Sequence, residues 1–147
     1  MRINIRQAEE KDIHEITTIE SLTSPDHWSE NAIRHDVCEN DNACVLVAEA
    51  DGEIVGYLDA WKVADEFQLC NVGVLESYRG NHIGQQFMDV LIGIAKELKC
   101  TVITLEVREK NIVARQMYDK NGFQVVGIRK NYYQNDSDNA ILMDKEL

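Results

Sequence analysis

The chain has 147 residues, the size of one ordinary domain, and we expect residues 1–147 to form a single domain. No window approaches the roughly 20 consecutive apolar residues that span a bilayer, so a cytoplasmic location without a membrane partner is expected. The net charge of −11 disfavours direct binding to nucleic acid, because the phosphate backbone requires a basic surface.

The negative charge is unevenly distributed along the chain. Residues 1–50 carry eleven acidic and four basic side chains, a balance of −7, whereas residues 51–147 have a balance of −4. An acidic face in the first third would attract a cationic partner, such as a basic peptide or a polyamine. The alternative is that this acidity only keeps the protein soluble.

Cysteine and histidine spacing gives no indication of a metal site. The four cysteines lack C-x-x-C spacing and the four histidines lack an H-E-x-x-H motif, so we expect no metal. Free, mostly buried thiols are the expected state of Cys38, Cys44, Cys70 and Cys100, and the alternatives are disulfides or a nucleophilic thiol.

The first half of the chain predicts a strand, two helices and three strands. Ser29 can cap the second helix, with Trp28 packed against it as a hydrophobic staple, and Asp51-Gly52 is a hairpin signal. Residues expected on one apolar face of the first helix are Ile13, Ile16, Ile19 and Leu22. The expected elements are a strand around residues 3–5, helices over 12–22 and 30–39, and strands over 45–50, 54–61 and 67–74.

The second half predicts a long helix, a strand, a short helix and two strands. Asn111 can cap the short helix, which should end at a left-handed Gly122. Residues expected on the core face of the long helix are Phe87, Met88, Leu91, Ile94, Ala95 and Leu98. The last three strands are expected over residues 101–107, 123–128 and 140–143. Together the elements predict a mixed α/β (α+β) fold with about seven strands in one central sheet and four helices.

A loop between the strand over residues 67–74 and the long helix has the features of a phosphate site. Unpaired amide N–H groups and the helix dipole favour an anion at a helix N-terminus, glycine permits close approach, and Arg79 adds a full positive charge. A turn of this kind also occurs without any ligand. The loop residues expected to hold a phosphate are Arg79, Gly80, Asn81, His82, Ile83, Gly84 and Gln85.

Two side chains further along could handle protons. Glu106 stands at the end of a predicted strand and Tyr118 on the helix that follows. An amine must lose a proton before it attacks a thioester, and the departing thiolate must regain one, so a carboxylate and a phenol suit these steps. The alternatives are that Glu106 pairs with Arg108 or Arg115, and that Tyr118 is a core aromatic.

The phosphate loop resembles a known motif. Val72-Gly73-Val74, followed by Tyr78-Arg79-Gly80-Asn81-His82-Ile83-Gly84, is similar to the acyl-CoA pyrophosphate motif of the GCN5-related N-acetyltransferases (GNAT), Arg/Gln-x-x-Gly-x-Gly/Ala. The resemblance implies acetyl-CoA as cosubstrate, splayed central parallel strands, and a pantetheine arm that pairs with the main chain of Val72, Gly73 and Val74. His82 departs from the motif because it stands where the first glycine is expected, which is costly if that position requires positive φ.

Further stretches resemble the RimI group of this superfamily, over nearly the whole chain from about Trp28. They are Trp28-Ser29-Glu30, Leu105-Glu106-Val107-Arg108, Asn111, Tyr118, Gly122-Phe123 and Arg129-x-Asn131-Tyr132-Tyr133. The group acetylates the N-terminal alanine of a small-subunit ribosomal protein.

That resemblance implies roles for individual residues. Glu106 would be the base, Tyr118 the acid, and Asn111 a residue near the CoA arm. Trp28, Tyr132 and Tyr133 would line the acceptor site for a basic protein or peptide N-terminus. We expect a monomer or a weak dimer. The alternatives are acetylation of a small-molecule amine and a non-catalytic acyl-CoA-binding regulatory subunit. The departure at His82 is the only support for the regulatory subunit.

Overall fold

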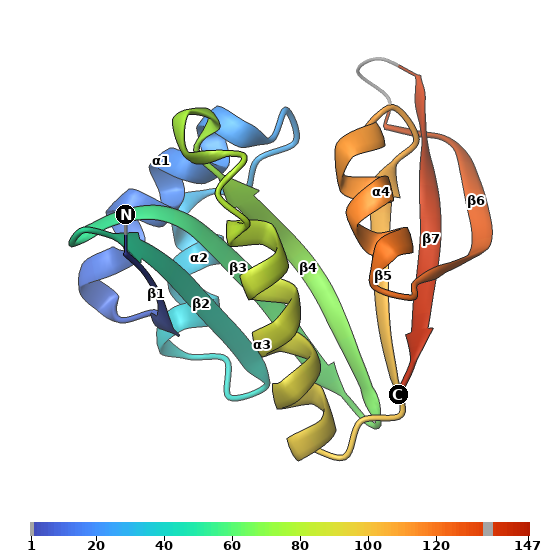
Figure 1. Ribbon diagram of the computed structural model, residues 1–147, viewed down its shortest axis with the longest axis horizontal. Helices are drawn as coiled ribbons and strands as arrows, with labels where there is room; N and C mark the ends of the chain where they lie inside the picture. The colour runs from blue at the N-terminus through green and yellow to red at the C-terminus, as the bar shows by residue number, and fades with distance from the viewer. Residues whose placement is uncertain (1, 134–136) are drawn as a thin grey trace.

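The computed structural model describes residues 2–133 and 137–147, and these form one seven-stranded mixed sheet with the order β1-β2-β3-β4-β5-β7-β6 (Figure 1). The strands are β1 (Ile3–Gln7), β2 (Ala43–Ala50), β3 (Glu53–Val63), β4 (Glu66–Val74), β5 (Val102–Arg108), β6 (Gln124–Tyr133) and β7 (Asp138–Glu146). The helices are α1 (Ile13–Thr23), α2 (Glu30–Cys38), α3 (Ile83–Glu97) and α4 (Ile112–Lys120), with short 3-10 turns η1 (Glu10–Asp12) and η2 (Glu76–Tyr78). The predicted fold class is confirmed. None of the helices in this described part is long and apolar enough to cross a membrane.

The predicted helix ends are confirmed by their capping contacts. The Ser29 hydroxyl accepts the amide N–H of Ala32 at 3.2 Å, and the Asn111 side chain accepts that of Ala114 at 3.3 Å. Gly122, two residues beyond α4, has a φ of 90°. These local signals therefore determine where α2 and α4 begin and where α4 ends.

Two predicted core positions were wrong. Leu22 is 70% exposed and Leu98 is 44% exposed. A spacing of three residues turns only 300°, so Leu22 lies half a turn away from Ile13, although each step between them is small. Leu98 follows the last residue of α3 and leaves the helical face.

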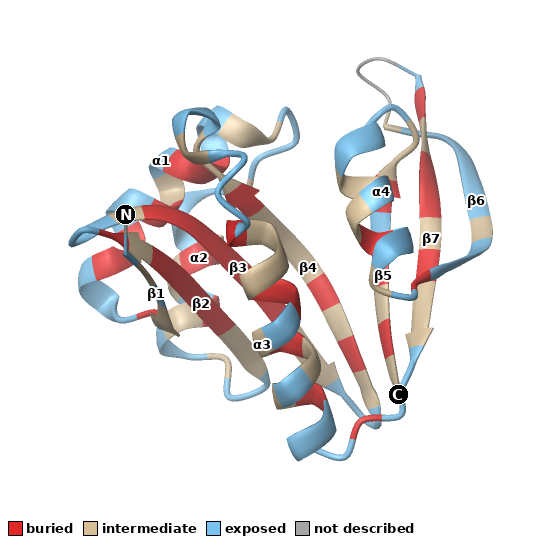
Figure 2. Ribbon diagram, in the orientation of Figure 1, coloured by how far each residue is buried: buried red, intermediate tan, exposed pale blue. Residues whose placement is uncertain are grey.

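Helices cover both faces of the sheet (Figures 1 and 2). Alternate residues of β2 point to opposite faces, so Val45 and Val47 pack with α1 and α2, whereas Leu46 and Ala48 join the larger core with α3. That larger core continues through β5 and β7 to Tyr118 of α4. Of the four cysteines, only Cys100 is buried, so the expectation of mostly buried thiols was wrong.

The two parallel strands at the centre of the sheet separate along their length, as Figure 1 shows. β4 pairs with β5 only from Glu66–Val102 to Leu69–Leu105, and both strands continue beyond that point without pairing to each other. In the pairing of β3 with β4, Leu69 faces Ala60 and Asn71 faces Asp59, so Cys70 is an extra residue in a β-bulge. The bulge bends β4 where the separation begins, and the predicted splay is confirmed.

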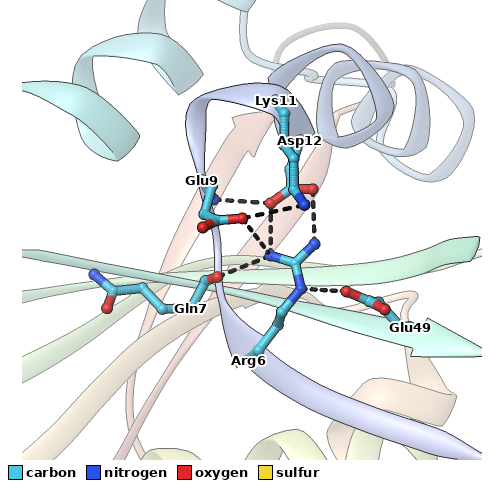
Figure 3. Close-up of polar contacts among 6 residues, drawn as sticks. All are labelled: Arg6, Gln7, Glu9, Lys11, Asp12 and Glu49. Carbon is cyan, nitrogen blue, oxygen red and sulfur yellow. Dashed lines mark hydrogen bonds and ion pairs between the residues drawn. The ribbon is translucent and has the colours of Figure 1, made fainter. Parts of the chain in front are cut away.

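Part of the acidity of the first third lies inside the protein. Asp12 is 3% exposed and receives two hydrogen bonds from the Arg6 guanidinium, at 2.8 and 2.9 Å (Figure 3). Arg6 also bonds Glu49, and the hydrogen bond from Arg6 is the main reason that the pKa of Asp12 lies below its ordinary value. Glu20 and Asp36 are buried as well. The acidic surface expected for residues 1–50 is therefore smaller than the charge balance suggested.

Candidate active site

A cleft of about 840 Å³ lies where β4 and β5 separate. One wall comes from the loop between α1 and α2 and from β4. The opposite wall comes from β5, α4, β6 and β7. Residues more than 100 positions apart in the sequence therefore meet here because two halves of one sheet diverge.

Glu106 is the first residue of β5 beyond the last pair with β4. Strand alternation buries its neighbours Leu105 and Val107 in the core beneath α3 and α4, so Glu106 points to the other face, where it lines the cleft. Its side chain is 36% exposed, and its carboxylate lies 3.5 Å from the Arg129 guanidinium of β6. The ion pair that the structure shows for Glu106 is thus with Arg129.

Tyr118 reaches the same cleft from the helical core. It is 4% exposed, and its ring packs against Phe123 with centroids 5.6 Å apart. Burial raises the pKa of the phenol above its ordinary value of about 10, so the hydroxyl stays protonated beyond the pH at which an exposed phenol ionises. Tyr118 is a core aromatic and a cleft residue at once, and it faces the gap from the side opposite Glu106.

Trp28 connects the loop between α1 and α2 to the bulged strand. Its backbone N–H donates to the buried Glu20 carboxylate at 2.8 Å, and its ring meets Trp61 edge-on with centroids 6.3 Å apart. With the Asn71 amide turned so that its oxygen faces the indole, Asn71 accepts the Trp28 Nε1–H at 3.1 Å. These contacts hold the aromatic wall of the cleft against β4.

Tyr132 and Tyr133 form the end of β6, which extends beyond its predicted limit at residue 128. Their rings meet edge-on at 5.1 Å. The Arg108 guanidinium lies 4.0 Å from the centre of the Tyr133 ring, and the Arg129 guanidinium lies 5.6 Å from that of Tyr132. Aromatic rings and two cations therefore line the β6 side.

The predicted phosphate loop lies at the start of α3, outside the lining of this cleft. Gly80 has a φ of 84° and His82 a φ of 61°, so the residue that replaces the motif glycine adopts the left-handed conformation. The first intrahelical bond runs from the Gln86 amide to the His82 carbonyl, and the amides of residues 83–85 precede it. The Arg79 guanidinium donates to the Val74 carbonyl at 3.3 Å, and Asn81 to the Tyr78 carbonyl at 2.9 Å.

Seven of the predicted site residues are brought together in the cleft, namely Trp28, Val72, Glu106, Asn111, Tyr118, Tyr132 and Tyr133. Gly73 and Val74 lie further along β4. A side chain at Gly73 would approach the Thr23 hydroxyl to 2.6 Å, so a larger residue there would require the Thr23 side chain at the end of α1 to move. Ile83 is buried, which leaves only its backbone for a ligand.

Buried acids behind the cleft wall that Trp28 and β4 form were not predicted. Glu20 also accepts the Tyr57 hydroxyl, and Asp59 faces Asp36 beneath the bulge. Burial, together with Asp36 and Glu20, raises the pKa of Asp59 to about 9. A charged residue on the apolar face of a helix, as Glu20 is relative to Ile13 and Ile16, is the signal that could have identified one of them.

Comparisons with known proteins give a consistent result. Residues 11–123 match the model of the Acetyltransferase (GNAT) family. A Bacillus subtilis protein, provisionally named a [ribosomal protein bS18]-alanine N-acetyltransferase, is 36% identical over 95% of this chain and 92% of its own. The Haemophilus influenzae protein of that name is 34% identical over 95% of each chain. The crystal structure of the ribosomal-protein-S18-alanine N-acetyltransferase from Escherichia coli is 24% identical, covers 99% of this chain and 94% of its own, and shares the fold with a TM-score of 0.91.

Proposed function

Because the chain belongs to the GNAT acetyltransferase family, we propose that it transfers the acetyl group of acetyl-CoA to the N-terminal alanine of a small-subunit ribosomal protein. The observation that carries this proposal is the cleft between the diverging strands, which a carboxylate enters from one face and a phenol from the other. The names of the two relatives, which specify ribosomal protein bS18, support this choice of acceptor.

The chain has suitable groups for the donor. Beyond Leu69, the edge of β4 that faces β5 is unpaired in the sheet, so the main chain of residues 72–74 is available to a pantetheine arm. The first amides of α3, with Arg79 and Gly80 beside them, suit a pyrophosphate. The donor supplies a thioester whose carbonyl carbon is the electrophile and whose thiolate is the leaving group.

Glu106 and Tyr118 would act at opposite ends of the reaction. An α-amine has a pKa near 7.7 to 8.0, so most of it is protonated at neutral pH, and Glu106 would accept that proton directly or through a water. The amine then attacks the carbonyl, and the tetrahedral intermediate collapses with loss of the thiolate. Tyr118, whose phenol is neutral at this pH, would donate its hydroxyl proton toward the sulfur.

The walls of the cleft suit a peptide acceptor. Besides Tyr118, three aromatic side chains, Trp28, Tyr132 and Tyr133, line it together with Asp26 and Glu106. Aromatic walls can hold the side chains of an extended peptide, and the carboxylates favour a cationic N-terminus. This proposal places the enzyme in the same compartment as ribosomal protein synthesis.

Thiol release measures the proposed activity directly. We would incubate the protein with acetyl-CoA and a hexapeptide beginning Ala-Arg, and compare it with the same peptide carrying a blocked α-amine and with a polyamine. The free peptide is expected to give at least about tenfold higher kcat/KM than the polyamine, and the blocked peptide no turnover. Turnover of the polyamine alone would replace the peptide with a small amine, and binding of CoA without thiol release from any acceptor would remove the enzymatic proposal.

A further inference from the structure

Two amide side chains join the phosphate loop of residues 79–85, called the donor loop below, to the helix that carries Tyr118. Gln85 lies in the first turn of α3, and Asn121 is the C-cap of α4. The Gln85 side-chain N–H donates to the Asn121 oxygen at 2.8 Å, and the Asn121 side-chain N–H donates to the Gln85 oxygen at 3.0 Å. This reciprocal pair connects residues 36 positions apart, one on each side of the diverging strands.

A second contact lies immediately beside the pair. A side chain at Gly84 would approach the Met117 sulfur to 2.8 Å, so α3 and α4 lie close together here and a larger residue would require the Met117 side chain to move. Asn121 also binds back into the last turn of α4. Its side chain donates to the Met117 carbonyl at 2.8 Å, and its backbone N–H reaches the carbonyl of Tyr118 at 3.0 Å.

The contact matters because donor and acid are held by different parts of the protein. The start of α3 would hold the donor phosphates and so set the position of the sulfur, whereas Tyr118 belongs to α4. The direct ladder between the two halves is only four residue pairs long, and its last pair, Leu69–Leu105, lines the cleft. A displacement of about 1 Å between reacting groups can cost on the order of 100-fold in rate.

We propose that the Gln85–Asn121 pair is a positioning device that sets the Tyr118 hydroxyl relative to the donor loop. This inference rests on the proposed acetyl transfer. Gln85 has two separate roles in this arrangement, because its backbone amide faces the phosphate site while its side chain holds α4. Neither Gln85 nor Asn121 touches the reacting atoms, so both act through Tyr118.

Hydrogen exchange of the α4 amides tests the Gln85–Asn121 pair without any acceptor substrate. We expect exchange over residues 112–120 to be at least about fivefold faster in Gln85→Ala and in Asn121→Ala than in the wild type. Asp89→Ala is the matched control, because Asp89 also accepts from Gln85, at 2.9 Å, but lies on α3 itself. The exchanged pair Gln85→Asn/Asn121→Gln keeps both amides and should restore protection. Unchanged exchange in the alanine variants would overturn the inference, whatever reaction the enzyme catalyses.

Kinetics then separate positioning from general loosening. Gln85→Ala should lower kcat about tenfold while the KM for acetyl-CoA changes less than twofold. In the Tyr118→Phe background the same substitution should have no further effect on kcat, because the group that it positions is already absent. Losses that multiply in the double variant would overturn the inference even though acetyl transfer itself is observed. If the wild type shows no turnover, that result counts against the proposed function. The exchange experiment still tests whether the Gln85–Asn121 pair holds α4.

Discussion

Arg108 of β5 lies 2.6 Å from the carboxylate of Asp26, in the loop between α1 and α2, so an ion pair crosses between the two walls of the cleft. The Arg108 side chain is only 14% exposed, and its guanidinium also stacks on Tyr133 and lies 3.7 Å from Asp138. Arg108 therefore connects the loop, β5, β6 and β7. The position of the loop relative to the aromatic end of β6 depends on this cation.

Replacing one partner of this pair should loosen the acceptor wall. Asp26→Asn is expected to raise the KM for the hexapeptide about threefold to tenfold while the KM for acetyl-CoA stays within twofold, because Asp26 lines the cleft and the phosphate loop of residues 79–85 does not. Steady-state kinetics with each substrate varied separately gives both constants. Asp41→Asn, in an exposed turn, is the matched control. An equal effect there would show that the change in net charge, and not the loss of the Asp26–Arg108 ion pair, is responsible.

Removing the phenol should slow the chemical step. Tyr118→Phe keeps the packing against Phe123 and is expected to lower kcat at least about tenfold, since general acids contribute roughly 100-fold to 10,000-fold. A rate within twofold of the wild type would exclude an important acid role.

The pH profile of kcat gives a separate test of Tyr118. Burial raises the pKa of Tyr118 above the ordinary value of about 10, so the acid form persists through that pH. The wild-type kcat should therefore not decline between pH 8 and 10. A decline in that window that is absent from Tyr118→Phe would contradict the assignment of a raised pKa.

Local signals predicted the element boundaries well because their physical causes are local. Ser29, Asn111 and Gly122 act within three residues of their own positions, and the structure shows each as predicted. Leu22 was misplaced because a three-residue repeat drifts around a helix, an error that grows with each turn.

The contacts that build the site could not be predicted in this way. Glu106 pairs with Arg129 of β6, and this contact reaches across β7, which lies between β5 and β6 in the sheet order. Glu20 meets Tyr57 across 37 positions, and Gln85 meets Asn121 across 36. Such pairs depend on how α1 lies on β3 and how α3 lies against α4, which no periodicity in the sequence specifies.

His82 offers a direct test of backbone strain at the donor loop. A left-handed conformation costs a non-glycine residue about 1 to 2 kcal/mol, and the added freedom of unfolded glycine offsets about 0.5 to 1 kcal/mol of any gain. His82→Gly should therefore raise the free energy of unfolding by about 0.5 kcal/mol, measured by urea denaturation. His82→Ala keeps the strain and should give no increase, so a gain of equal size in both variants would show that the imidazole itself is unfavourable.

Asp59 should make stability depend on pH. Its pKa is raised from 3.8 to about 9, so between these values the folded protein retains a proton that the unfolded chain has lost, and stability falls as pH rises. Asp59→Asn removes this dependence and should be more stable than the wild type at pH 8 by at least about 1 kcal/mol, with a smaller difference at pH 5. Urea denaturation at both values measures it. A difference that is constant with pH would mean that Asp59 is ionised in the folded protein.

The most direct test of the proposed function is mass spectrometry of ribosomal protein bS18 after incubation with acetyl-CoA and either the wild type or Glu106→Gln. We expect the wild type to add one acetyl group to the α-amine of the N-terminal alanine, and Glu106→Gln to be slower by at least about tenfold, most strongly at pH 6.5, where more of the amine is protonated. Acetylation confined to lysine side chains, or an equal rate and pH profile for Glu106→Gln, would contradict the proposal.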